Sequence, residues 1–512
     1  MMPQTCDHSV PSKQLVFLAF PIHFSRMFAK WLSIAALFFF MTAGHLFAAN
    51  PSAKRPNFIF ILADDLGWSD LGCYGHPQIK TPNLDRLAKQ GTLFTQFYVN
   101  GSVCSPSRCA FMTGRYPARH QIHGHYAEHA QNAARGMNNW LDSKVPNVAA
   151  LLHKAGYATA HFGKWHLGSG EGAPPPTDYG FDESRTVNAN GPGWDEPDVK
   201  FRAKSSAAIV DETIRFITAH KDKPFYVNAW MLVPHATLNP TEEQMQPYAN
   251  LQPGGKDFPF KSAAQVFYSS ITDMDKHIGR LLKALDELGL AENTVILFSS
   301  DNGPEDIHVL NAGHSGVGSA GPFRGRKRSL YEGGIRVPGI VRWPGKIPAG
   351  QIDNKSVVAG VDWLPSVCKL VGVEIPAAHK LDGEDMSDIF QGTAHPRTKP
   401  LMWEWRFRVF GEPFHQSPML AIRDGDWKLL LNPDRSRVEL YEIKKDLTQL
   451  NNVAEKNPDV VARLSEKVLT WQKELPPGPT APDVGQVSYP WPSKEKATAP
   501  SDAPKKKRAD NQ

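Results

Sequence analysis

Short apolar runs alternate with helical patterns from residue 57 onward, and this alternation constrains the fold of the chain more than any other sequence feature. Residues 57–63 (NFIFILA) have the length and composition of a buried strand, and residues 269–288 carry apolar side chains at helical spacing. The other expected strands in this part are 157–162, 224–233 and 294–298, and the other expected helices are 84–90, 146–155 and 205–220. The pattern predicts an α/β domain with a large, mostly parallel sheet covered by helices on both faces.

The pattern changes after about residue 390. Four short strand-like runs and one helical pattern follow, at 401–407, 419–423, 427–431, 438–441 and 458–474. We therefore predict a large domain over 50–390 and a smaller C-terminal subdomain over 391–475, built of an antiparallel sheet and a helix. Residues 476–512 are rich in Pro, Lys, Ala and Ser, which predicts a disordered tail.

The first residues of the chain resemble an export signal. Lys30 precedes the apolar run 31–41, and the small residues Ala48 and Ala49 follow. The run is shorter than the ~20 residues that span a bilayer, so we predict a signal peptide over 1–49 rather than an uncleaved membrane anchor. A secreted or periplasmic protein without stable membrane insertion is expected. The five cysteines (Cys6, Cys73, Cys104, Cys109 and Cys368) form no dense disulfide framework and no paired zinc motif, and the sequence leaves their pairing open.

The distribution of charge along the chain bears on whether the protein binds nucleic acid. The formal net charge is +5, and the basic excess is spread over the two ends and the body of the chain. The KKKR run at 505–508 lies in the expected tail, where such a run is usually solvated. We therefore expect no nucleic-acid partner.

Polar side chains follow four of the expected strands. They are Asp64 and Asp65, Lys164 and His166, His235, and Asp301 and Asn302. Because ligands of open α/β sheets bind at the carboxyl ends of the strands, we expect these clusters to converge on one site. The carboxylates and the amide are hard oxygen donors, which calcium prefers, whereas zinc would favour His or Cys. We predict one Ca²⁺ per chain held by Asp64, Asp65, Asp301 and Asn302; for an adjacent Asp pair alone, a turn or helix cap is the alternative.

The segment Cys104-Ser105-Pro106-Ser107-Arg108, followed by Thr113-Gly114, resembles the signature C-x-P-S-R-x-x-x-x-T-G of formylglycine-dependent sulfatases, a family of the alkaline phosphatase superfamily. The resemblance extends in the family's order from residue 55 to about 470. It includes 55–67 with its Asp pair, GKWHLG at 163–168, SDNG at 300–303, and RGRK with YEGGIRVP at 324–338. The stretch 321–338 is similar to bacterial relatives of N-acetylgalactosamine-6-sulfatase and arylsulfatase A, which are sulfuric ester hydrolases.

The resemblance implies a mechanism. A separate maturation enzyme would oxidise Cys104 to formylglycine, whose hydrate would join the calcium shell and attack sulfur. A covalent sulfate–enzyme intermediate would form, and the second hydroxyl of the hydrate would then expel sulfate. Asp301 would accept the proton of the attacking hydroxyl, and Arg108 and Lys164 would hold the hydrate. Lys327 and His235 would contact sulfate, and either could protonate the leaving oxygen. His166 would be the base that releases sulfate. Taken singly, Lys164 and Arg108 would more often be surface charges and His166 a core histidine; their place together inside the matched motifs favours the site.

Two other functions compete with a sulfatase. A formylglycine-dependent phosphodiesterase or phosphonate monoester hydrolase of the same superfamily would use the same residues, although Asn302 argues against a two-zinc phosphatase. A noncatalytic protein that binds sulfated glycans would keep the pocket but leave Cys104 unmodified. The natural substrate is not readable from the sequence. Export and the long loops 169–200 and 239–262 favour a sulfated carbohydrate or other sulfated small molecule. The histidines between 120 and 129, and His314, stay outside the predicted site.

Overall fold

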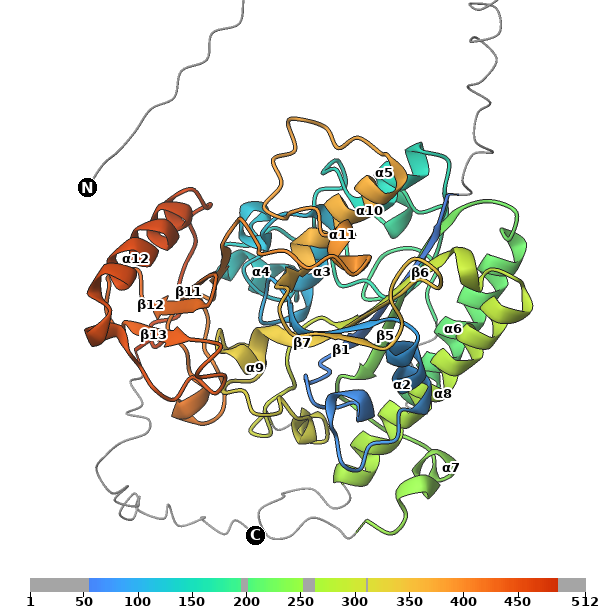
Figure 1. Ribbon diagram of the computed structural model, residues 1–512, viewed down its shortest axis with the longest axis horizontal. Coiled ribbons are helices and arrows are strands. Elements are labelled where there is room, and N and C mark those ends of the chain that lie inside the picture. Colours follow the sequence, from blue (N-terminus) through green and yellow to red (C-terminus); the bar gives the residue numbers. More distant parts are fainter. Residues whose placement is uncertain (1–54, 195–200, 252–262, 310–311, 487–512) are drawn as a thin grey trace, which may run out of the picture. The chain divides into compact units, whose positions relative to one another are not determined.

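The computed structural model describes residues 55–194, 201–251, 263–309 and 312–486 (Figure 1). The expected signal peptide at 1–49 lies outside these ranges. Within them, no helix combines the length and the apolar character needed to cross a membrane. The described cysteines, Cys73, Cys104, Cys109 and Cys368, are all free.

The main sheet of the described residues has nine strands in the order β4-β3-β5-β1-β6-β7-β2-β8, with β9 paired to β2. The strands are β1 (Asn57–Asp64), β2 (Thr92–Tyr98), β3 (Ala158–Lys164), β4 (Glu183–Val187), β5 (Phe225–Pro234), β6 (Thr294–Ser300), β7 (Arg336–Arg342), β8 (Gln351–Asp353) and β9 (Val358–Ala359). All pairings are parallel except those of β7, which runs antiparallel to β6 and to β2. The predicted mostly parallel sheet is confirmed.

Helices cover both faces of this sheet (Figure 1). Successive β1 side chains point to opposite faces, so Phe58 and Phe60 enter one core and Ile59 and Ile61 enter the other. The first core is closed by α3 (Cys104–Thr113), α5 (Val148–Lys154) and α10 (Trp363–Val371), and the second by α2 (Pro82–Lys89), α6 (Phe201–Ala219) and α8 (Ala263–Glu287). Short helices α4 (His129–Ala134), α7 (Glu242–Met245), α9 (Glu332–Ile335) and α11 (Ser387–Phe390) lie in the connections.

A second, four-stranded sheet follows in the order β10-β11-β12-β13, antiparallel throughout. Its strands are β10 (Leu401–Glu404), β11 (Leu420–Asp424), β12 (Trp427–Leu431) and β13 (Glu439–Glu442), and α12 (Pro458–Lys473) packs against β11 and β12. The expected small antiparallel sheet with its helix is therefore confirmed; the boundaries 50–390 and 391–475 stay predictions. Of the expected tail, residues 476–486 are described: Ala481 N–H donates to Arg406 O at 2.8 Å, and Val484 is 5% exposed.

The two sheets meet at a buried carboxylate. Glu332 of α9 accepts from Lys428 Nζ of β12 at 2.7 Å, from Arg336 Nη1 at 3.2 Å and from the Tyr98 hydroxyl at 2.5 Å. Burial raises the pKa of Glu332, but Lys428 and Arg336 outweigh it and hold that pKa at about 2. Burial lowers the pKa of Lys428 to about 8; the Glu332 carboxylate opposes this shift, and the nearby Arg423 and Arg336 charges add to it.

Replacing Lys428 with methionine is expected to destabilise the protein by about 3 kcal/mol, because removal of one partner leaves a buried charge poorly compensated. Chemical denaturation would measure the loss. Lys428→Arg, which keeps a cation beside the carboxylate, should lose less stability. Lys445→Met, at an exposed ion pair with Glu442, is the control and should cost under ~1 kcal/mol. Equal stability of Lys428→Met and the unsubstituted protein would contradict the prediction.

Candidate active site

Four neighbouring parallel strands, β3, β5, β1 and β6, end at the site. Asp64 is the last residue of β1 and Lys164 is the last residue of β3. His235 directly follows β5, and Asp301 directly follows β6. The topology therefore brings carboxylates and cations from distant parts of the chain together at the carboxyl ends of these strands, where open α/β sheets bind ligands.

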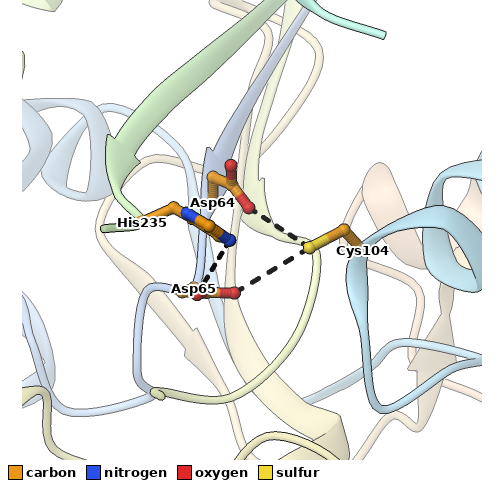
Figure 2. Close-up of side chains that lie close together, drawn as sticks. All are labelled: Asp64, Asp65, Cys104 and His235. Atoms are coloured by element: carbon orange, nitrogen blue, oxygen red, sulfur yellow. Dashed lines mark hydrogen bonds and ion pairs between the residues drawn. The ribbon is translucent and has the colours of Figure 1, made fainter. Parts of the chain in front are cut away.

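Cys104 is the first residue of α3 and lies among these groups (Figure 2). Its Sγ atom is 3.5 Å from Asp64 Oδ1, 4.0 Å from Asp65 Oδ1 and 3.5 Å from Lys164 Nζ. Pro106 occupies the first turn, where a missing N–H costs nothing, and the N-terminal helix end carries partial positive charge. The side chain is buried, and burial together with the Asp301 carboxylate raises the pKa of the thiol far above its usual value. An unmodified Cys104 is thus held as a neutral thiol, which is a poor nucleophile.

Each carboxylate of the site is paired with a buried cation. Lys164 Nζ lies 2.6 Å from Asp64 Oδ2, and Lys327 Nζ lies 2.7 Å from Asp65 Oδ2. Burial raises the pKa of Asp64, but the Lys164 ammonium and the other nearby cations outweigh it and hold that pKa well below its usual range. The close backbone approach before Lys164 requires glycine: Gly163 has φ of +109°, and a Cβ there would lie 1.8 Å from Trp230 O.

Asp301 connects helix α3, which begins at Cys104, to the aspartate pair after β1. Arg108, four residues after Cys104 on α3, donates from Nε at 3.0 Å and from Nη2 at 2.7 Å to Asp301 Oδ2. The other oxygen, Oδ1, accepts the Asp65 N–H at 3.1 Å. Burial and the neighbouring Asp64 carboxylate raise the pKa of Asp301 to about 6. The guanidinium of Arg108 is fully buried and lies over the Trp230 ring.

Four side chains of the site lie close enough to hold a metal ion together, and His235 is among them although it was predicted to contact sulfate. Asp64, Asp65, Cys104 and His235 place one ligand atom each within 4.8 Å of one another, and Figure 2 shows their side chains directed at a common point. The Asn302 amide also indicates a cation. Its Nδ2 donates to Asp65 Oδ1 at 2.7 Å and to Gly303 O at 2.9 Å, whereas its buried Oδ1 has no partner. A buried carbonyl oxygen without a donor is costly, and a cation would satisfy it.

The two histidines of the predicted site differ in their contacts. His235 Nε2 is 3.8 Å from Asp65 Oδ2, and burial first, then the Lys164 charge, lowers the pKa of its ring to about 4. His166 has a positive φ of 56°, its Nε2 lies 3.0 Å from Tyr126 O, and its buried Nδ1 has no partner. Burial and Lys164 lower the pKa of His166 well below its usual value. Both rings therefore stay neutral near neutral pH.

A cleft of about 320 Å³ opens onto the cluster. Five of the predicted site residues line it: Cys104, Lys164, His166, His235 and Lys327. The more deeply buried predicted residues, namely Asp64, Asp65, Arg108, Asp301 and Asn302, are 0–1% exposed and lie behind it. Because these five side chains line one cleft, a bound anion could contact several of them together.

Sequence reasoning missed several residues of this cleft, above all Glu305 and Arg328. Glu305 Oε2 is 3.3 Å from Lys327 Nζ, and the Arg328 guanidinium contacts both oxygens of the same carboxylate. Arg328 N–H also donates to Ser102 O at 2.8 Å, two residues before Cys104. Their proximity in the sequence could have indicated them, since Glu305 lies three residues after Asn302 and Arg328 directly follows Lys327. His125, left outside the predicted set as part of a polar loop, lines the cleft as well.

Comparisons with known proteins agree with this geometry. The family model described as "Sulfatase" matches residues 56–373, and the model described as "N-sulphoglucosamine sulphohydrolase, C-terminal" matches residues 321–474. Human arylsulfatase A is 33% identical over 417 residues, covering 73% of this chain and 75% of that protein. N-acetylgalactosamine-6-sulfatase of Rattus norvegicus is 33% identical over 419 residues, covering 75% and 72%.

Solved structures are similar over most of the chain. The crystal structure of Ps i-CgsB in complex with k-i-k-neocarrahexaose has a TM-score of 0.69 and 27% identity, covering 83% of this chain and 94% of that one. A phosphonate monoester hydrolase of Agrobacterium radiobacter has a TM-score of 0.60 and 21% identity, covering 82% and 96%, and shares the fold. Taken with the site, these matches define a sulfuric ester hydrolase. The chain belongs to the sulfatase family.

Proposed function

We propose that this sulfatase is calcium-dependent and hydrolyses the sulfate ester of a sulfated carbohydrate, with formylglycine made from Cys104 as its nucleophile. One observation carries the proposal: Cys104 Sγ lies 3.5 Å from Asp64 Oδ1 and 3.5 Å from Lys164 Nζ. This is the position at which a hydroxyl on that carbon would share the oxygen donors of a metal site and the charge of a lysine. A buried thiol with a raised pKa would itself be inert there.

The proposed chemistry needs two groups that the unmodified side chains do not provide, namely a calcium ion and the formylglycine hydrate. Asp64, Asp65, Asp301 and Asn302 would hold Ca²⁺, which when bound would supply positive charge that favours a deprotonated nucleophile and stabilises sulfate oxygens. The formylglycine hydrate supplies one hydroxyl for attack on sulfur and a second whose deprotonation allows sulfate to leave. The unpartnered Asn302 Oδ1 supports the first of these assignments.

The protein's residues orient the nucleophile and handle its proton. Lys164 lies within reach of both position 104 and Asp64, so it holds the nucleophile and favours its anionic form. Arg108 fixes the Asp301 carboxylate by two hydrogen bonds to one oxygen, which leaves the other directed toward the Asp65 side of the site. Asp301 is the proposed acceptor of the attacking proton.

Side chains on the cleft wall contact the substrate. Lys327 is held by Asp65 and Glu305 and presents a fixed charge to the sulfate group. His235 Nδ1 is engaged by Ala236 O at 2.7 Å, so its Nε2 is the atom that faces the site. The proposed donor of the proton to the leaving oxygen is Lys327, or His235 once its Nε2 has taken up a proton, because the neutral ring holds its proton on Nδ1 toward Ala236 O. His166, whose Nδ1 is unpartnered, is the proposed base for sulfate release.

The substrate class and cellular context are part of the same proposal. Sulfated carbohydrate is supported by the likeness to Ps i-CgsB, a protein solved with an oligosaccharide. A maturation enzyme that converts Cys104 is the implied partner. Export by the leader at 1–49 is proposed from its sequence, and determination of the N-terminal residue of protein recovered outside the cytoplasm would test it.

Turnover of matched substrates tests the proposed function. The protein matured in cells that convert the signature cysteine should hydrolyse an aryl sulfate with kcat/KM at least about tenfold above that for an aryl phosphodiester, or ~1.4 kcal/mol of transition-state preference. A panel of sulfated oligosaccharides then identifies the natural class. A reversed preference would instead indicate the formylglycine-dependent phosphodiesterase or phosphonate monoester hydrolase, and no turnover with an unmodified Cys104 peptide would indicate a binding protein.

A further inference from the structure

A second cleft, larger than the catalytic one, lies near the junction of the two sheets. Its volume is about 830 Å³, within the range of small-molecule and oligosaccharide sites. We call it the outer cleft and define it by Trp68, Pro322, Lys355, His395, Lys444 and Leu447. None of these residues lines the catalytic cleft.

The floor of the outer cleft is rigidly built. The pairing of β2 with β7 shifts register between Phe94 and Phe97, which frees Thr95 O from the ladder. That oxygen accepts from Trp68 Nε1 at 3.3 Å and from Arg336 Nε at 2.7 Å. The Trp68 ring also packs edge-on against Phe323 at 5.0 Å between centroids. The indole plane is therefore fixed before any ligand arrives, while the residue remains only half-buried.

The lining combines apolar surface with positive charge. Trp68, Pro322 and Leu447 offer apolar faces, and Leu447 is 41% exposed. Lys355, His395 and Lys444 offer positive charge or hydrogen bonds, and none of the described residues that line the cleft is Asp or Glu. His395 and Lys444 contact Asp388 and Asp426, but such exposed pairs contribute little and exchange readily for another anion.

We propose that the outer cleft is a second binding site for a sulfated oligosaccharide chain. The C–H face of a pyranose ring would pack on the Trp68 ring, and its sulfate groups would contact Lys355 and Lys444. This inference rests on the proposed function in one respect, namely that the substrate is a sulfated carbohydrate. Trp68 follows Asp65 by three residues and Phe323 precedes Lys327 by four, so the same two loops shape both clefts. A chain anchored in the outer cleft would raise the local concentration of sulfate esters near the catalytic one.

Affinity electrophoresis in gels that contain heparin, chondroitin sulfate or carrageenan, each beside its desulfated form, tests the proposal. At least one sulfated polysaccharide, and not its desulfated form, should retard the protein. The charge reversal Lys355→Glu/Lys444→Glu should weaken that binding by about tenfold, because it reverses the two exposed charges that would contact sulfate groups. Lys283→Glu/Lys473→Glu, which changes the net charge equally on exposed positions outside the cleft, should bind as the unsubstituted protein does.

Small-substrate kinetics separate this site from the catalytic one. Turnover of an aryl sulfate, which needs only the catalytic cleft, should be unchanged in Lys355→Glu/Lys444→Glu. Equal loss of binding in both double variants would overturn the proposal by showing general electrostatic attraction, and stronger retardation by polyglutamate would overturn it in favour of an acidic peptide. Failure of the unsubstituted protein to hydrolyse aryl sulfate would contradict the proposed function instead, because retardation in the gel requires no turnover.

Discussion

Replacement of Cys104 with alanine is expected to lower kcat/KM for an aryl sulfate by about 10⁴-fold or more, because loss of a nucleophile removes the covalent route entirely. Cys104→Ser should be comparably impaired where the serine is not oxidised, since a single hydroxyl could attack sulfur but could not discharge it. The fold should tolerate both changes, because the Cys104 thiol only contacts the polar groups around it. Steady-state kinetics and circular dichroism give the two readouts.

Cys109 provides a matched control on the same helix. It is also buried and free, and its Sγ contacts Thr113 Oγ1 at 3.9 Å rather than the site. Cys109→Ala should keep aryl sulfate turnover within about threefold, with a modest loss of stability from the deleted sulfur. Mass spectrometry of the peptide that contains residue 104 should show the aldehyde in active protein. Normal turnover by folded Cys104→Ala would refute the assignment of the nucleophile.

The sequence predicted the strands that carry the site. It missed β4 at one edge of the sheet and the strands β7, β2, β8 and β9 toward the other edge. β1, β5 and β6 are long apolar runs, so their burial on both faces was visible. β7 contains Pro338 and Gly339, which disfavour a strand, and its residues resemble a family motif rather than an apolar run. Helix α3 was also hard to see in full, since all ten of its residues are buried and no amphipathic pattern marks it.

Site residues were predictable where topology, rather than side-chain packing, decides their position. Asp64, Lys164 and Asp301 stand at the ends of parallel strands, and parallel strands bring such ends together. Glu305 and Arg328 lie in irregular loops, whose course cannot be predicted from a sequence pattern. Only the structure shows that the Glu305 carboxylate contacts both Lys327 and Arg328. How completely the carboxylates and cations pair could not be predicted from the sequence either, and this pairing governs how the protein should behave without the proposed metal.

Removal of the proposed calcium ion is expected to abolish turnover while leaving the protein folded. The three carboxylates Asp64, Asp65 and Asp301 each contact a buried cation of the chain, so their mutual repulsion is compensated even without an ion. A chelator should therefore lower the thermal midpoint without unfolding the protein at room temperature. Re-added Ca²⁺ should restore activity and, at 100 times its dissociation constant, add ~2.7 kcal/mol of stability.

The Asn302 amide makes this prediction specific to one site. Asn302→Ala removes a neutral ligand and leaves Asp65 its Lys327 partner, so the variant should fold while its affinity for Ca²⁺ falls by about 10- to 100-fold. Calorimetric titration measures the affinity directly, and the Ca²⁺-induced rise in thermal midpoint should shrink in parallel. Asn138→Ala, at an exposed asparagine that donates to His120 O, should bind as the unsubstituted protein does. Unaltered Ca²⁺ affinity in Asn302→Ala would mean that the orphaned carbonyl faces something other than the ion, because a lost ligand cannot leave binding energy unchanged.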